Sequence, residues 1–335
     1  MITRSPENPF AMRRPFAAIT PLAGLLLVLA ALVAGLQIAS TNYSSATHAS
    51  FPAEFVAFVP GPNNPVFSAA GEGHWDTKIR ERGWILREGN DWKLWYTGYD
   101  GTRAGIKLLG LATSSDGLTW TRHPGNPLIA DHWVEDMTVV KRGGVYYMFA
   151  EGVGDHAQLL TSTDGIDWQR HGTLDIRYTT GQPLTPGPFG TPTIWVEDGL
   201  WHLFYERLDA GVWLATSRDL KTWTNVQDQP VLLPGPEAYD KHMIAMNQIV
   251  KHDGWYYALY HGTPAAKSPW NTDVARSRDL LHWQKFPGNP IVPGDKSSGE
   301  FVFDGEQLRL YTLHALVDIY YPRATNPKPA EPSQP

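Results

Sequence analysis

Short runs of apolar and aromatic residues, each bounded by turn-forming residues, recur along most of the chain. In each unit a short apolar segment, such as residues 137–140 or 247–250, leads through a glycine-containing turn to an aromatic run. The aromatic runs cover residues 92–96, 146–149, 201–205 and 255–260. Runs of this composition between turn signals are typical of β-strands. The order of runs and turns predicts antiparallel meanders of four strands each.

A polar turn with the pattern Ser-x-Asp-x-x-x-Trp follows the aromatic run in four units. Its aspartates are Asp116, Asp164, Asp219 and Asp279, so successive turns lie 48, 55 and 60 residues apart. Self-similarity at such a period indicates repeated supersecondary units that bury their faces against one another. Four-stranded antiparallel units stacked in this way are the blades of a β-propeller.

The fifth unit is divided between the two ends of the chain. Residues 300–303, 307–313 and 315–320 supply three strands but lack the Asn-Pro segment that ends the other units. That segment occurs near the other end, at residues 64–67. A ring closed by an N-terminal strand leaves no exposed sheet edge at the junction. We therefore predict an all-β fold, a five-bladed propeller closed by an N-terminal strand that joins the last blade.

The first forty residues have the pattern of an export signal. Arg13 and Arg14 precede an apolar run over residues 16–38, and no acidic residue follows until Glu54. A basic stretch before an apolar core is typical of a signal peptide, and the length of the run also suits a membrane anchor. We predict a signal peptide or anchor at 1–40, a linker at 41–51, the propeller at 52–322 and a disordered, proline-rich tail at 323–335. The protein is then exported, and the anchor is its one expected contact with a membrane.

Composition and charge narrow the function. The net charge of −6 offers no basic face for nucleic acid, and the absence of cysteine excludes disulfides and thiolate metal sites. The 14 tryptophans and 14 tyrosines suit an all-β protein. We expect a monomer.

The repeated aspartate invites a catalytic interpretation, but a residue that recurs in every unit cannot mark a single site. An aspartate at a turn accepts hydrogen bonds from nearby backbone N–H groups. The repeated tryptophan is expected to pack between blades. These turns resemble the Asp-boxes of sialidases, with a spacing one residue shorter, and we infer no sialidase activity from them.

Chemistry is expected where the blades differ, at the mouth of the central channel. There the inner strands begin and the aromatic strands end. The positions that break the repeat at these places are Trp75, Asp76, Trp133, Glu135, Asp136, Glu151, Thr191, Glu206, Asp240, His242, Asn247 and His261.

The repeat resembles the five-bladed propeller glycosidases, that is, glycoside hydrolase families 43, 32, 117 and 130. The resemblance rests on Trp75-Asp76, on the Leu-Trp-Tyr-Thr-Gly segment at 94–98, on the first Ser-x-Asp turn and on Asn-Pro-Leu-Ile at 126–129. It covers the predicted propeller. It implies a glycoside hydrolase that acts on an extracytoplasmic poly- or oligosaccharide, furanosides included.

The resemblance also implies roles for individual residues. Asp76 matches the aspartate that serves as base or nucleophile, and Asp136 matches the aspartate that orients the substrate and tunes the acid. The glutamate that supplies the acid is replaced by Gly190. Another acid is then required, with Glu206 as the first candidate and His242 or Glu151 as alternatives.

Substrate contacts are expected from the remaining positions at the mouth. These are Trp75, Trp133, Glu135, Thr191, Asp240, Asn247 and His261. Hydrolysis by carboxyl groups requires no cofactor. The histidines show no recognised metal-ligand spacing, and a calcium ion in the central channel is implied by the resemblance alone.

Two other functions stay open. A phosphorylase or pyranosidase like family 130 would need a basic phosphate pocket, for which the nearest residues are Lys78, Arg80, Arg82 and Lys241. A carbohydrate-binding propeller without activity would agree with the loss of the acid at Gly190. Three carboxylates that converge at the mouth would favour catalysis, whereas a single aspartate among aromatic residues would favour binding.

Overall fold

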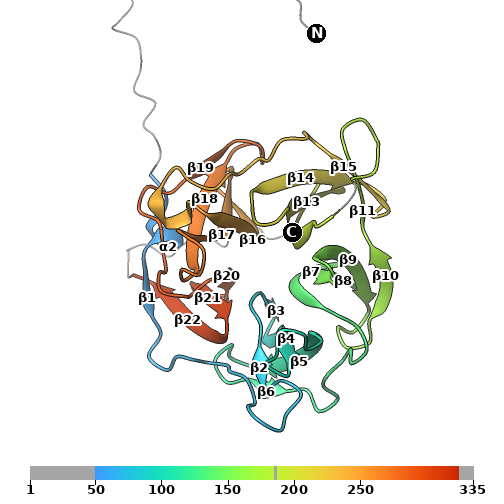
Figure 1. The fold of residues 1–335 in the computed structure, drawn as a ribbon. Coiled ribbons are helices and arrows are strands. Elements are labelled where there is room, and N and C mark those ends of the chain that lie inside the picture. The colour runs from blue at the N-terminus through green and yellow to red at the C-terminus, as the bar shows by residue number, and fades with distance from the viewer. Residues whose placement is uncertain (1–49, 185–186, 324–335) are drawn as a thin grey trace, which may run out of the picture. The chain divides into compact units, whose positions relative to one another are not determined.

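The computed structural model describes residues 50–184 and 187–323, which form five antiparallel β-sheets arranged in a ring (Figure 1). The sheets follow one another around the ring in chain order, as the colours from cyan to red show. The predicted five-bladed propeller is confirmed. The predicted export segment and nearly all of the predicted linker and tail lie outside the described residues. Within the described ranges, no helix has the length and apolar character needed to cross a membrane.

Each blade is one sheet whose strands run from the channel outward. The first blade contains β2 (Lys78–Ile79), β3 (Trp84–Glu88), β4 (Asp91–Tyr99), β5 (Leu108–Ser114) and β6 (Thr121–Arg122). The second contains β7 (Glu135–Arg142), β8 (Val145–Gly152), β9 (His156–Ser162) and β10 (Gln169–Thr173). The third contains β11 (Asp175–Arg177), β12 (Gly190–Glu197), β13 (Leu200–Glu206), β14 (Val212–Ser217) and β15 (Thr222–Asn225).

The last two blades complete the ring, together with two short helices. The fourth blade contains β16 (Met243–His252), β17 (Trp255–Thr263), β18 (Asn271–Ser277) and β19 (Trp283–Lys285). The fifth contains β20 (Gly299–Phe303), β21 (Leu308–His314), β22 (Leu316–Pro322) and β1 (Phe58–Pro60). The helices are α2 (Ala53–Val56) and the 3₁₀ turn η1 (Ala238–Asp240).

The repeated Ser-x-Asp turns hold the link between the third and fourth strands of a blade. In the second blade, Asp164 Oδ1 accepts hydrogen bonds from the N–H groups of Ile166 and Asp167, at 2.8 and 2.9 Å. These donors lower the pKa of the Asp164 carboxyl because they favour its charged form. The aspartates of the other three turns each accept two N–H groups in the same way. The structural role predicted for them is confirmed.

The tryptophan of each turn packs against the preceding blade, as predicted. Trp223 is fully buried and lies edge-on to Phe149 of the second blade at 5.7 Å. Trp168 contacts Trp95 of the first blade at 6.0 Å, and Trp283 contacts Phe204 of the third at 6.1 Å. Large aromatic side chains at these junctions bury apolar area between sheets that share no hydrogen-bonded edge.

The Asn-Pro segments are not the outer strands that the sequence predicts. The outer strands of the first and fourth blades, β6 and β19, lie directly after or at the turn tryptophan. The asparagine side chains then extend the sheet edge beyond them. Asn126 accepts a hydrogen bond from Leu111 N–H and donates one to Leu111 C=O, both at 2.9 Å. Asn289 does the same with Val274 at 3.0 Å. The amide group thus takes the place of a strand residue.

Ring closure by an N-terminal strand is confirmed, but the strand lies earlier than predicted. It is β1, which pairs with β22 from Phe58 opposite Pro322 to Pro60 opposite Tyr320. The predicted segment at 64–67 contributes the amide of Asn64, which pairs with both backbone groups of Ile319, and a single bridge between Phe67 and Val317.

Candidate active site

A cavity of about 310 Å³ opens where the inner strands of the second and third blades begin. Carboxyl groups dominate its lining, and the one cationic side chain among the described lining residues is that of Arg80. The lining residues are Arg80, Glu81, Glu135, Asp136, Glu151, Asp155, Thr191, Glu206, Leu208, Asp209, His261 and Trp270. Buried carboxylates so close together repel one another when they are ionised. The protonation of these groups therefore decides what the site can do.

β-Bulges aim the side chains of the inner strands into this cavity. The register of β7 shifts between Glu135 and Thr138, and that of β12 shifts between Gly190 and Thr193. At the bulges, Asp136 has a φ of 50° and Thr191 a φ of 47°. Such left-handed backbone costs a non-glycine residue about 1–3 kcal/mol and is concentrated at functional sites. The equivalent bulge of β16 contains Asn247.

Gly190 lies between two glutamates that come from the ends of the next strands. A Cβ atom at Gly190 would lie 2.3 Å from Oε2 of Glu151 and 2.5 Å from Oε1 of Glu206. The two oxygens are therefore separated by less than the sum of these distances. The Thr191 N–H donates a hydrogen bond to the same Glu151 oxygen at 3.0 Å. The glycine that the sequence marks as a missing acid thus makes room for two neighbouring acids.

Burial and mutual repulsion raise the pKa values of these carboxyl groups. Asp136 and Glu151 are nearly inaccessible to solvent, and burial raises the pKa of each well above its usual range. Glu135 raises the pKa of Asp136 further, and Asp136 raises that of Glu151. Burial also raises the pKa of Glu206, although the N–H of Asp209, which donates to its Oε2, opposes this. Burial and the Glu206 charge raise the pKa of Asp209 to about 7.

The cation of the cavity is already engaged. Arg80 Nη2 lies 3.0 Å from Glu81 and 3.2 Å from Oε1 of Glu135. The second oxygen of Glu135 and Oδ1 of Asp136 are buried without a hydrogen-bond partner among the described residues. An acid with a free oxygen in a cavity can donate its proton to a ligand.

Arg82 fills the centre of the channel behind the cavity. It is 2% exposed, and its Nη2 donates to Pro192 C=O and Thr193 Oγ1 at 3.1 Å each, with a longer contact to Asn247 C=O. Its own carbonyl accepts the N–H of Met137 at 3.2 Å. A residue before β3 therefore connects the inner strands of three other blades.

Calcium, which the family resemblance implies for the channel, does not fit beside this guanidinium. The inner-strand oxygens that could bind a cation there already accept hydrogen bonds from Arg82, and a second positive charge would be repelled. Outside the channel, Glu135, Asp136 and Glu151 each place one carboxylate oxygen within 4.8 Å of the others. Oxygen donors of this type suit a hard cation, so a cation would have to bind at the cavity.

Asp76 does not reach the cavity. Its carboxylate accepts hydrogen bonds from Arg122 Nε at 2.8 Å and from Tyr96 Oη at 3.2 Å, inside the first blade. Asp240 of the fourth blade has the same surroundings, with Lys285 as the cation and Tyr260 Oη at 3.0 Å. In both blades the tyrosine follows the aspartate by 20 residues. An arrangement that repeats in two blades is expected to be structural. The surroundings of Asp76 therefore give no support to its predicted catalytic role, and those of Asp240 give none to a substrate contact.

The other predicted residues divide between the cavity and the body of the blades. Glu135, Thr191 and His261 line the cavity, together with Asp136, Glu151 and Glu206. Asn247 lies behind it and contacts His261 Nδ1 through its amide nitrogen at 3.0 Å. The residues found outside the lining are Trp75, which packs on Tyr96; Trp133, whose ring lies under Lys107; and His242, which is solvent-exposed.

Several lining residues carry no signal that marks them in the sequence. Asp155 and Asp209 belong to loops that directly follow Glu151 and Glu206. Glu81 belongs to the segment that separates β2 from β3. That interruption of the first inner strand is visible in the sequence, and it could have indicated that residues 80–83 turn into the channel.

Comparisons with known proteins agree with this fold. No family model matches the chain. A 1,2-beta-oligomannan phosphorylase from Thermoanaerobacter sp. (strain X514) is 29% identical over 170 residues, which are 47% of this chain and 53% of that protein. The chain therefore spans about half the length of that curated relative.

Solved structures match over most of the propeller. A glycosyl hydrolase from Bacteroides ovatus superposes with a TM-score of 0.70 at 18% identity, over 84% of this chain and 98% of that one. The beta-1,2-mannobiose phosphorylase from Listeria innocua superposes with a TM-score of 0.62 at 15% identity, over 78% and 95%. At these identities the likeness shows the shared fold. It is a propeller fold on which both glycoside hydrolases and glycoside phosphorylases are built.

Proposed function

We propose that this protein is a glycoside hydrolase whose chemistry is carried out by Asp136 and Glu206 at the mouth of the propeller channel. The observation that carries the proposal is the convergence of buried carboxyl groups around Gly190 without a free cation among the described lining residues. Glycoside hydrolysis needs one carboxyl group that donates a proton and one carboxylate that acts on water or on the sugar.

Asp136 is suited to be the proton donor. Its pKa is raised well above the usual range because it is buried and lies beside Glu135. A raised pKa favours the protonated form, which a general acid needs. Its Oδ1 has no hydrogen-bond partner among the described residues, and Asp136 lines the cavity in which the glycosidic bond would lie. Protonation of that oxygen lets the bond to the anomeric carbon break and releases the aglycone as an alcohol.

Glu206 is suited to be the base. From the sequence alone it is expected to be the acid. Burial raises its pKa, but the N–H group of Asp209 donates to its carboxylate and opposes this rise, whereas Oδ1 of Asp136 has no such donor among the described residues. An ionised Glu206 can take a proton from the water that attacks the anomeric carbon. Glu151 shares the space beside Gly190; burial and the neighbouring Asp136 raise its pKa.

The surroundings favour hydrolysis over phosphorolysis. A phosphate dianion needs cationic partners, and Arg80 is already paired with Glu81 and Glu135. Arg82 is hydrogen-bonded inside the channel, and Lys78 and Lys241 are exposed outside the cavity lining. A phosphate would therefore face several carboxyl groups. The same convergence of acids favours catalysis over simple carbohydrate binding.

The relatives suggest where the search for a substrate should begin. One curated relative acts on 1,2-β-oligomannan, and a propeller of the same fold is a phosphorylase of β-1,2-mannobiose. We infer that β-mannosides are the first class to test, followed by α-L-arabinofuranosides, which a further propeller of this fold is named for. The predicted export segment would place the substrate outside the cytoplasm.

The test is an assay of the full-length protein on β-1,2-mannobiose, aryl β-D-mannosides and aryl α-L-arabinofuranosides, each with and without inorganic phosphate. We expect release of the free sugar without any need for phosphate. Asp136→Asn should lower kcat by about 10²–10⁴-fold, the usual contribution of a general acid. The matched control is Asp167→Asn, at an exposed turn residue far from the cavity lining.

Each alternative has its own outcome. Formation of a sugar 1-phosphate, and only with phosphate present, would show a phosphorylase. Sugar binding without turnover by the wild type would show a carbohydrate-binding propeller. Full activity of Asp136→Asn would show that the acid lies elsewhere.

A further inference from the structure

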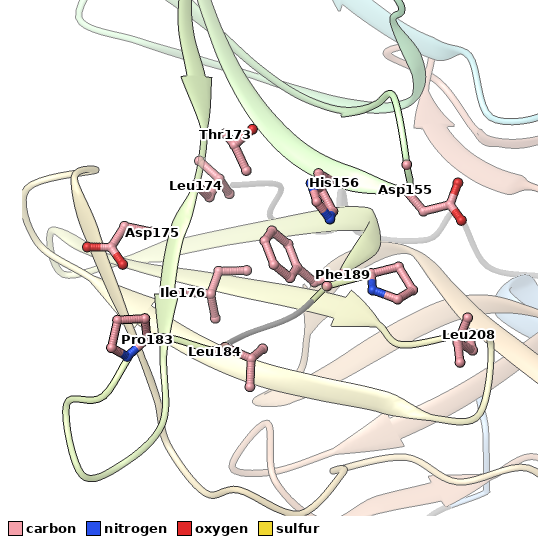
Figure 2. Close-up of a pocket in the computed structure, with 13 residues that line it drawn as sticks. Asp155, His156, Thr173, Leu174, Asp175, Ile176, Pro183, Leu184, Phe189 and Leu208 are labelled. Atoms are coloured by element: carbon pink, nitrogen blue, oxygen red, sulfur yellow. The ribbon is translucent and has the colours of Figure 1, made fainter.

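A second, larger cavity lies beside the acid cavity, between the second and third blades. Its volume is about 530 Å³ (Figure 2). It is a groove rather than a closed chamber, with Asp155 and Leu208 at one end and Asp175 and Pro183 at the other (Figure 2). The backbone closes the floor, because Phe189 N–H donates to Asp155 C=O and Ala157 N–H to Phe189 C=O, at 3.0 Å each.

The two cavities adjoin each other. Asp155 and Leu208 line both of them. These residues belong to the loops that directly follow Glu151 and Glu206, so they lie next to the proposed chemistry. Leu208 is 71% exposed and has a φ of 54°, a backbone conformation that leucine rarely adopts. An exposed leucine held in this conformation at the junction of two cavities is suited to contact an apolar ligand.

The groove is apolar where it is deep. Its floor consists of buried hydrocarbon side chains, and the His156 ring stacks on Phe189 at 5.0 Å and 11°. The floor residues are Leu174, Ile176, Leu184 and Phe189.

The charges of the groove are both negative. Asp155 and Asp175 are the charged residues in its described lining, and Asp175 is paired with Arg177 at 2.6 Å. An anion would be repelled here. Over the floor itself, the hydroxyl groups of a second sugar would lose hydrogen bonds to water that the hydrocarbon side chains cannot replace, which is costly. A neutral hydrocarbon group would gain from the same surface.

We propose that this groove is an aglycone subsite that takes a neutral hydrocarbon group, aromatic or aliphatic, attached to the sugar in the acid cavity. The inference rests on the proposed function, because it names the substrate class of that site. The sugar ring lies beside Trp270 and His261 of the fourth blade, whose rings meet edge to face at 4.9 Å. The glycosidic oxygen lies at the junction, and the aglycone passes over Leu208 into the groove.

The experiment compares methyl, n-butyl and n-hexyl glycosides in the β-D-mannopyranoside and α-L-arabinofuranoside series. Binding is measured by calorimetry on the Asp136→Asn protein, which should cleave them at least about a hundredfold more slowly than the wild type. Turnover is measured on the wild type. Each methylene that enters the groove should tighten binding about fourfold, until the groove is filled. The hexyl glycoside should therefore bind at least about tenfold more tightly than the methyl glycoside.

Two variants test whether the groove is responsible. Leu208→Asn keeps the size of the side chain, replaces its apolar surface, and suits a positive φ. It should reduce the hexyl advantage about tenfold. Thr173→Trp, at an exposed position on the groove wall, should block entry and remove the advantage. The matched control is Val153→Thr, because Val153 is also 71% exposed on the neighbouring loop but does not line the groove.

The outcomes separate this inference from the proposed function. Turnover without any preference for longer alkyl chains, or a preference that survives both groove variants, would overturn the subsite. So would affinity that grows with the number of sugar units and not with alkyl length. A hexyl preference that depends on Leu208, in a protein without turnover, would uphold the subsite and refute the hydrolase.

Discussion

Two sets of buried acids in the propeller have different surroundings. Asp76 and Asp240 are 1% and 0% exposed, and each has a cation and a tyrosine hydroxyl on its carboxylate. Asp136, Glu151 and Glu206 are almost as buried but have no cationic partner among the described residues. The paired acids form ion pairs inside their own blades, whereas burial raises the pKa values of the unpaired acids. Burial alone therefore does not identify a functional acid; the partner does.

The unpaired acids are also placed by different parts of the fold. They lie on bulges of the inner strands and at the ends of the next strands, where the chain can point a side chain into the channel mouth. The paired acids precede the inner strands and point back into their own blade. The comparison predicts that substitutions in the first set change the rate, and substitutions in the second change stability.

The largest effect on the reaction rate is expected from Gly190→Ala. The added Cβ would push apart Glu151 and Glu206, since both approach within 2.5 Å of its position. A displacement of this size at reacting groups costs about a hundredfold in rate, so kcat should fall by at least that factor. Gly190 is not among the described glycines with positive φ, and its backbone therefore tolerates alanine.

Steady-state kinetics measure kcat of the variant, and a thermal melt measures its stability. A melt close to that of the wild type with a large loss of kcat supports the steric explanation. Unchanged kcat would mean that the meeting of the two glutamates is not needed for the reaction.

The second effect is expected in stability, from Asp76→Asn and Asp240→Asn. Each change removes the carboxylate charge that pairs with the partly exposed Arg122 or with Lys285, and should lower the free energy of unfolding by about 1–3 kcal/mol. At temperatures well below the melt, kcat should stay within about threefold of the wild type. Urea unfolding and kinetics on the same samples separate the two quantities. A stable Asp76→Asn protein without activity would support the catalytic role that the sequence predicts for Asp76.

A smaller effect is expected in the pH dependence of stability, from Asp209→Asn. The folded protein raises the pKa of Asp209 from 3.8 to about 7, so between these values the folded state binds more protons than the unfolded state. The stabilisation is therefore complete below pH 4 and is lost as the pH rises toward 7. The asparagine cannot ionise, and at pH 8 the variant should be more stable than the wild type by about 1–3 kcal/mol.

Urea unfolding at pH 4, 6 and 8 measures this difference, which should disappear at pH 4. The control is Asp253→Asn, an exposed aspartate whose φ of 47° resembles the 54° of Asp209. Equal pH slopes for wild type and Asp209→Asn would mean that burial and the Glu206 charge do not raise the pKa of Asp209.

Much of the fold could be predicted from the sequence because its signals are local. The hydrogen bonds of the Ser-x-Asp turns join residues two or three positions apart, so the pattern fixes the turn wherever it occurs. The outer strands were harder to place. The side chains of Asn126 and Asn289 pair with backbone groups 15 residues away. The sequence pattern of these segments does not distinguish such side-chain pairing from a true β-strand.

The candidate site was predicted in part. Aligning the blades placed Glu135 and Gly190 where inner strands begin, and Glu151 and Glu206 where aromatic strands end. The strand register pairs Glu135 with Glu151 and Gly190 with Glu206. It could not show that Glu151 and Glu206 both turn toward Gly190, because that depends on packing between two blades. Nor could it show that a loop residue, Arg82, enters the channel and binds three other blades.

By itself, the sequence determined the number of blades, their order, the turns that hold them and the positions at which they differ. The tertiary structure alone decided which buried acid has a cation. Arg122 lies 46 residues from Asp76 and Lys285 lies 45 residues from Asp240, while no comparable cation reaches Asp136 among the described residues. The physical reason is that the charge state of an acid depends on the distance to other charges and on the exclusion of water. Both are set where strands of different blades meet, and a repeat of similar sequences does not encode them locally.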